Sequence, residues 1–160
     1  MELTITPAFD APEEVRKLFE EYTKMLVEGD PAFGDYLAIQ NYDREILHLE
    51  EKYGPPRGRL YLARWNGETA GCIALRPLDE SHCEMTRLYV RPAFRGRGIA
   101  RKLVDTILAD ARAIGYTEML LDTLPFLTGA IALYEDLGFT HTGCYNDSPL
   151  DTTVYMKLVL

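Results

Sequence analysis

The chain has 160 residues, a length typical of a single domain, and we expect one domain over residues 1–160. Its 25 acidic against 17 basic side chains give a formal net charge of -8, which argues against general nucleic-acid binding because that needs a basic face. No apolar run approaches the roughly 18 residues needed to span a bilayer, and the first residues do not read as a secretion signal, so we expect a cytoplasmic protein without membrane contact.

The first part of the chain predicts a short strand at residues 3–6 and a helix at about 12–28, where apolar residues recur at helical spacing. The sequence Gly29-Asp30-Pro31 ends that helix. The following segment, 33–57, is less regular. We expect a second short helix in it, which stops at Gly54-Pro55-Pro56.

A β-hairpin is the clearest local structure in the first half, with strands at 59–65 and 68–76. The intervening Asn66-Gly67 is a strong signal for a type I′ turn, which matches the twist of paired strands. A further strand is expected at 83–91. Apolar residues at helical spacing then predict a helix at 99–114.

The last third of the chain alternates again between strand and helix. A mostly apolar strand, compatible with burial on both faces, is expected at 117–124. A short helix is expected at 128–137, and two closing strands at 139–145 and 152–159. The resulting order, β-α-α-β-β-β-α-β-α-β-β, predicts an α/β domain built on a mixed sheet. The three cysteines are widely spaced without a C-x-x-C pair, so we expect no metal site.

A glycine-rich turn joins the expected strand at 83–91 to the helix at 99–114, and it reads Arg95-Gly96-Arg97-Gly98-Ile99-Ala100. Such a turn presents backbone N–H groups at a helix N-terminus, which together with the helix dipole form an anion site suited to a pyrophosphate. The dinucleotide spacing G-x-G-x-x-G is absent because position 101 is arginine. A structural strand-to-helix turn is the alternative reading.

Two motifs in this order resemble the GNAT superfamily of acyl-CoA-dependent N-acyltransferases. Residues 95–100 fit the family signature R/Q-x-x-G-x-G/A, and residues 130–139 look like its second hallmark, A-I-x-L-Y-x-x-L-G-F. The resemblance implies the GNAT fold, a mixed and mostly antiparallel sheet of about seven strands flanked by about four helices. It also implies an enzyme that moves an acetyl or similar acyl group from acyl-CoA to a primary amine.

The resemblance implies acetyl-CoA or another acyl-CoA as co-substrate, no metal, and direct attack of the amine on the thioester. It places the pantetheine arm of CoA along the strand that ends at Val90 and the pyrophosphate on the glycine-rich turn. A backbone N–H near Leu88 then stabilises the developing oxyanion. The cofactor-binding residues implied are Leu88, Tyr89, Val90, Arg95, Gly96, Arg97, Gly98, Ile99 and Ala100.

Two proton transfers need side chains in such a mechanism. Tyr134 matches the family tyrosine that protonates the leaving thiolate, and an ordinary tyrosine pKa of about 10 suits a donor at neutral pH; a tyrosine that only packs is the alternative. Glu84 lies eleven positions before Arg95, the spacing at which histone-modifying members carry their glutamate base. A structural glutamate paired with an arginine explains it equally well, and His82 acting through water is a further alternative.

The acceptor site in this family is usually lined by the first two helices, their loop and the last strands. The candidate substrate-binding residues are therefore Tyr36, Arg57, Arg87, Tyr145 and Asn146. Aromatic rings with an arginine suit an amino-acid-like amine, whose carboxylate the arginine holds. Nearby acidic residues instead suit a polyamine or aminoglycoside.

One position departs from the family pattern. Many members carry an asparagine three residues before the alanine of the second motif, where it helps to hold the CoA arm. This chain has Leu127 there, and Thr123 or Thr128 are candidates to replace it. The apolar closing strand also leads us to expect a homodimer.

A small-molecule amine is the acceptor that we favour from the sequence. The alternatives are a protein N-terminus or lysine as acceptor, and a non-catalytic module that only binds acyl-CoA. The intact motif around Tyr134 argues against the non-catalytic alternative.

Overall fold

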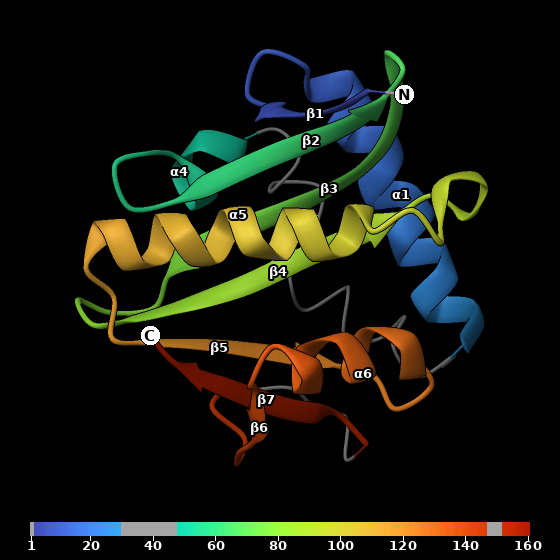
Figure 1. Ribbon diagram of the computed structural model, residues 1–160. Helices are drawn as coiled ribbons and strands as arrows, with labels where there is room; N and C mark the ends of the chain where they lie inside the picture. The colour runs from blue at the N-terminus through green and yellow to red at the C-terminus, as the bar shows by residue number, and fades with distance from the viewer. Residues whose placement is uncertain (1, 30–47, 147–151) are drawn as a thin grey trace.

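The structure, a computed structural model, describes residues 2–29, 48–146 and 152–160. Its elements form a mixed α/β fold (Figure 1). In chain order they are β1 (Leu3–Pro7), α1 (Pro12–Gly29), α4 (Leu49–Tyr53), β2 (Arg59–Trp65), β3 (Glu68–Pro77), β4 (His82–Val90), a 3₁₀ turn (Pro92–Phe94), α5 (Ile99–Ile114), β5 (Glu118–Thr123), α6 (Thr128–Asp136), β6 (Thr140–His141) and β7 (Val154–Val159).

The strands form one 7-stranded sheet in the order β1-β2-β3-β4-β5-β7-β6, in which every neighbouring pair is antiparallel except β4 and β5. The helix α5 covers one face, while α1 and α4 cover the other (Figure 1). Successive side chains of β3 point to opposite faces of the sheet. Ile73 and Leu75 therefore pack with α5, whereas Cys72 and Ala74 pack with α1 and α4. The predicted fold class and element order are confirmed.

Two local predictions differ from the structure. The strand expected at 139–145 is only Thr140–His141, because the chain then leaves the sheet and carries Tyr145 across to β4, where its hydroxyl bonds to Glu84. The strand β5 alternates between buried and half-buried side chains instead of being buried on both faces. Most of the second helix predicted before Gly54 falls outside the described residues, and α4 is the part that is described.

The pairing between the parallel strands β4 and β5 stops well before either strand ends. Their pairing ends at Glu84 and Leu120, although β4 continues to Val90 and β5 to Thr123. Beyond the last pair the two strands diverge, and α6 follows from the free end of β5 (Figure 1). We call this divergence the β4–β5 fork.

A β-bulge interrupts the other edge of β4 within the part of the strand that is not paired with β5. One residue of β3, Ile73, lies between the positions paired with Thr86 and Tyr89, so Arg87 and Leu88 together oppose it. Arg87 takes a φ of 59°, in the left-handed region that costs a residue with a Cβ about 1–2 kcal/mol. Backbone strain of this kind is concentrated at functional sites.

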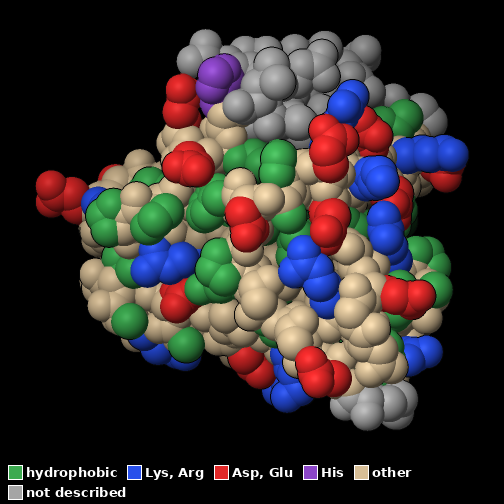
Figure 2. Space-filling view, turned by 90° about the horizontal axis from the view of Figure 1, so that it is seen from above, with side chains coloured by type: hydrophobic (Ala, Val, Ile, Leu, Met, Phe, Trp, Pro, Cys, Tyr) green, Lys and Arg blue, Asp and Glu red, His purple; other side chains and the backbone are tan. Residues whose placement is uncertain are grey.

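The described surface mixes charges of both signs. Figure 2 shows acidic and basic side chains interspersed over the face seen from above, with hydrophobic and neutral side chains between them. That face does not present the single-sign basic surface by which nucleic acid is held. Among the described residues, no helix is both long and apolar enough to cross a membrane.

Gly71 permits the close approach of β3 to the end of β4. A Cβ at this position would lie 2.4 Å from the carbonyl oxygen of Tyr89, which belongs to rigid backbone. We expect Gly71→Ala to destabilise the protein by about 1–3 kcal/mol, the usual cost of overpacking. Urea unfolding followed by circular dichroism measures this.

The matched control is Gly129→Ala in α6, where an added Cβ meets nothing within 4 Å. It should be neutral or stabilising, since alanine favours helix. Equal stability of the two alanine variants would contradict the packing described at Gly71.

Candidate active site

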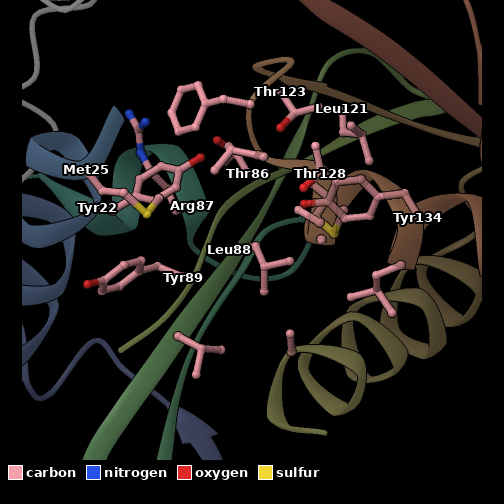
Figure 3. A pocket seen from close by; sticks show the side chains of 18 of the residues that line it. Tyr22, Met25, Thr86, Arg87, Leu88, Tyr89, Leu121, Thr123, Thr128 and Tyr134 are labelled. Atoms are coloured by element: carbon pink, nitrogen blue, oxygen red, sulfur yellow. The ribbon is translucent and has the colours of Figure 1, made fainter. Parts of the chain in front are cut away.

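A cavity of about 480 Å³ opens between the diverging strands of the β4–β5 fork. Figure 3 shows Tyr22 and Met25 of α1 on one side, Tyr134 of α6 on the other, and Thr86 and Leu88 of β4 between them. The lining comes from α1, β4, the glycine-rich turn, the start of α5, β5, α6 and the connection between β5 and α6. The fork therefore brings both sequence motifs to one hollow.

The glycine-rich turn forms one end of this cavity. Gly96 and Gly98 have φ angles of 79° and 74°, which glycine adopts without steric cost. An added Cβ at either position meets nothing within 4 Å, so the backbone of the turn is openly accessible. Gly98 immediately precedes the 16-residue helix α5 and makes no side-chain cap, which leaves the helix N–H groups for a ligand. The turn fits a phosphate group.

The basic side chains near the turn are held by the protein in different ways. Arg95 donates from Nε to the Val90 carbonyl at 2.9 Å and lies over the Tyr89 ring. Arg91 forms an ion pair with Glu21 at 2.8 Å. These contacts orient Arg95 along the cavity wall and tie Arg91 to α1.

Of the cofactor-binding residues predicted, Leu88, Tyr89, Val90, Arg95, Gly96 and Ala100 line the cavity. The other three belong to the same turn but do not line it. Arg97 stacks over Trp65, Gly98 precedes the helix, and Ile99 is buried in the core beneath α5.

Tyr134 is only 6% exposed and packs at a tilt against Phe139. Its ring reaches into the cavity from α6 (Figure 3). Burial raises the pKa of its hydroxyl above the ordinary value, and the charge of Asp122 adds to the effect. Among the described residues, no hydrogen-bond partner is found for this hydroxyl. Tyr134 therefore keeps its proton, and it lies in the wall of the cavity.

Glu84 is buried at the base of the fork, and both of its oxygens are occupied. Arg76 donates to Oε1 at 2.8 Å in an ion pair, and the Tyr145 hydroxyl donates to Oε2 at 2.7 Å. The structural role that the sequence allowed is thus present. Within the described lining of the cavity, Glu84 is not included.

Asp122 is a second carboxylate near the fork, and the sequence analysis missed it. It lines the cavity from β5, and Asn146 donates from Nδ2 to its Oδ2 at 2.8 Å. Burial raises the pKa of its carboxyl, and the nearby charge of Glu84 raises it further. The available signal was one acidic residue within the apolar run 119–124.

The predicted acceptor-binding residues lie in different places relative to the cavity. Arg87 is buried, lines the cavity and lies over the Phe19 ring, whereas Tyr145 and Asn146 hold the two carboxylates from outside it. Arg57 differs from the prediction. Its guanidinium donates to the carbonyls of Asp79 and Glu80 in the β3–β4 turn, away from the cavity. Tyr36 falls outside the described residues.

The position that departs from the sequence pattern also lines the cavity. Leu127 lies in the lining together with Thr123 and Thr128, on the connection from β5 to α6. The two threonine hydroxyls thus occupy the region where we expected a replacement for the missing asparagine.

The comparisons with known proteins agree with this geometry. The model of the acetyltransferase (GNAT) family matches residues 15–139. An uncharacterised N-acetyltransferase of Schizosaccharomyces pombe is 43% identical over 138 residues, which are 84% of this chain and 85% of that protein.

Two solved structures share the fold. An acetyltransferase from Streptococcus agalactiae superposes with a TM-score of 0.77 at 22% identity, over 99% of this chain and 98% of that one. The PaiA N-acetyltransferase from Thermoplasma acidophilum, solved in complex with coenzyme A, has a TM-score of 0.77 at 15% identity over 100% of both chains.

The raised pKa of Asp122 has a consequence for stability. A buried carboxyl with a raised pKa favours the fold when protonated, so its contribution is fully present below the unfolded pKa of about 4 and is lost as pH rises. We expect Asp122→Asn to unfold at higher urea than the parent at pH 7.5. This gain should shrink as pH falls toward about 4.

Asp110→Asn is the control. Asp110 forms an ion pair with Arg59, so removal of its charge should make the protein less stable at pH 7.5. An Asp122→Asn protein that is less stable than the parent at pH 7.5 would show that its ionised form is well solvated or paired.

Proposed function

The chain belongs to the acetyltransferase (GNAT) family, and on that premise we propose that it transfers an acetyl group from acetyl-CoA to the primary amine of a small molecule. The observation that carries the proposal is one cavity with an open glycine-rich turn at one end and a buried tyrosine hydroxyl at its side. The first suits a pyrophosphate and the second suits protonation of a thiolate.

In this proposal acetyl-CoA lies along the β4–β5 fork. The pyrophosphate sits on the backbone N–H groups of the turn from Gly96 to Ala100, and the pantetheine arm pairs with the free edge of β4. Support comes from the end of strand pairing at Glu84, which leaves the residues up to Val90 unpaired on the β5 side. The PaiA enzyme offers a parallel, because it was solved with coenzyme A bound.

The bulge in β4 gives the reaction its oxyanion donor. We place the thioester carbonyl at the backbone N–H of Leu88, since the bulge at Arg87 and Leu88 disrupts the regular ladder there. The amine attacks this carbonyl carbon, a C–N bond forms and the C–S bond breaks. Tyr134 then donates its proton to the thiolate, which a hydroxyl kept protonated by burial is able to do.

A small acceptor is favoured by the contact that narrows the cavity. The ring of Phe126, from the connection between β5 and α6, packs directly on Gly29 at the end of α1, where a Cβ would lie 2.2 Å from its Cζ. Phe126 lines the cavity, so α1 and the connection between β5 and α6 meet at its edge. An extended protein segment would need this contact to open, whereas a small amine would not.

Release of CoA thiol with a panel of amines tests the proposal directly. Phenylalanine, spermidine, phenethylamine, kanamycin and a lysine-containing peptide represent the acceptor classes under consideration. We expect amine-dependent thiol release with at least one of the small compounds. Turnover confined to the peptide would replace the small acceptor by a protein acceptor, and tight binding of acetyl-CoA without turnover would indicate a binding module.

The pyrophosphate placement predicts a specific loss of affinity. Gly98→Val forces a β-branched residue into a left-handed backbone and should move the turn, so we expect acetyl-CoA affinity to fall at least tenfold in calorimetry. Gly115→Val is the matched control, because Gly115 ends the same helix with a φ of 108° and an equally open surrounding. Equal affinities of both valine variants would place the pyrophosphate elsewhere.

Tyr134→Phe removes one hydroxyl and keeps the ring. If Tyr134 protonates the thiolate, turnover should fall by roughly 10²–10⁴-fold while acetyl-CoA affinity stays near the parent value. High pH should not restore activity, since it supplies no proton donor.

Tyr116→Phe is the matched control for this tyrosine. The Tyr116 hydroxyl donates to the Arg57 carbonyl at 2.9 Å, far from the cavity lining, and turnover should not change. Near-normal turnover of Tyr134→Phe, with chemistry rate-limiting, would mean that water protonates the thiolate.

A further inference from the structure

We propose that Asp122 is the group that receives the acceptor ammonium and takes its proton, and that Glu84 acts through Asp122 as a positioning residue. The inference rests on the proposed function and assigns the base within it. It replaces Glu84, the residue that sequence spacing favours for this role, by its neighbour across the fork.

Position is the first argument. Glu84 belongs to the last pair of β4 with β5, so it sits at the closed base of the fork. Asp122 lies two residues beyond the partner of Glu84 on β5, where the strands have separated. Of the two carboxylates, Asp122 lines the cavity and Glu84 does not.

Hydrogen bonding is the second argument. Each oxygen of Glu84 already accepts a hydrogen bond, one from Arg76 and one from Tyr145, and these two side chains lie between Glu84 and other donors. Asn146 donates a hydrogen bond to only one oxygen of Asp122, Oδ2. Among the residues that the structure describes, Oδ1 of Asp122 accepts no hydrogen bond. A carboxylate held by one oxygen and open at the other is able to accept an N–H donor.

Burial raises the pKa of the Asp122 carboxyl most, and the charge of Glu84 on β4 raises it further. The hydrogen bond from Asn146 and the charges of Arg87 on β4 and Arg76 on β3 lower it by less. The charge of Asp122 in turn raises the pKa of the Tyr134 and Tyr145 hydroxyls.

On β7, Tyr155 pairs with Asp122 in the ladder and donates to Oδ1 of Asn146 at 3.1 Å. Asn146 thus links Asp122 to β7 and fixes the carboxylate in place. The net result of burial and of these neighbours is a carboxyl whose pKa lies nearer to the working pH than that of an exposed aspartate.

The proton balance follows directly. The ammonium gives one proton to Asp122, and the free amine attacks the thioester carbonyl. As the C–S bond breaks, Tyr134 gives its proton to the sulfur and regains one from the nitrogen, which becomes the neutral amide. Asp122 releases its proton to solvent, so one ammonium and one thioester yield one amide, one thiol and one proton.

The test is the pH dependence of kcat/KM for the amine, at saturating acetyl-CoA, with the compound that the parent acetylates fastest among those named above. We expect Asp122→Asn to lower kcat/KM by roughly 10²–10⁴-fold at pH 7, with acetyl-CoA affinity kept as evidence of folding. The defect should shrink tenfold per pH unit toward the pKa of the amine, where no base is needed.

Glu84→Gln separates the two carboxylates. Removal of its charge should lower the pKa of Asp122, so the acidic limb of the profile moves to lower pH but persists. Asp110 on α5 is a carboxylate that accepts a hydrogen bond from Tyr61 on β2, and Asp110→Asn should leave the profile unchanged.

An Asp122→Asn profile like that of the parent, with the acidic limb lost in Glu84→Gln, would overturn this assignment and leave the proposed function standing. Absence of amine-dependent thiol release in the parent itself would overturn both.

Discussion

The separation of β4 from β5 is the constraint on which the site depends. Two parallel strands are paired only up to Glu84 and Leu120, and among the described residues the space beyond holds a cavity of about 480 Å³ instead of a further strand. Backbone groups on the open edges need partners, which a ligand with amide groups of its own can provide. The bulge at Arg87 and the glycine-rich turn lie along the same opening, so one break in the sheet positions each part of the cavity.

Charge at the base of the fork is balanced with few solvent contacts. The buried Glu84 forms an ion pair with the half-buried Arg76, and Asn146 joins Asp122 to the last strand. Burial raises the pKa of the Asp122 carboxyl, and the charge of Glu84 on the neighbouring strand raises it further. This division of roles comes from tertiary placement, because the two residues belong to different strands.

Much of this fold was predictable from local sequence, and parts of the site were not. The Asn66-Gly67 turn, the helix from Ile99 to Ile114 and the glycine-rich turn follow from signals within a few residues. The roles of Arg57 and Asp122 depend on which strands become neighbours and on where pairing stops, and no local pattern encodes that. Sequence spacing placed Glu84 near the chemistry but carried no information on Arg76 and Tyr145, which occupy its oxygens.

A crystal structure of the protein with acetyl-CoA tests the central claim most directly. The account predicts that the pantetheine arm lies between β4 and β5, that the pyrophosphate contacts backbone N–H groups from Gly96 to Ala100, and that the thioester carbonyl points to the bulge at Leu88. The thioester sulfur should then lie within hydrogen-bonding distance of the Tyr134 hydroxyl. Acetyl-CoA bound outside the β4–β5 fork, or with its thioester directed away from Leu88 and Tyr134, would contradict it.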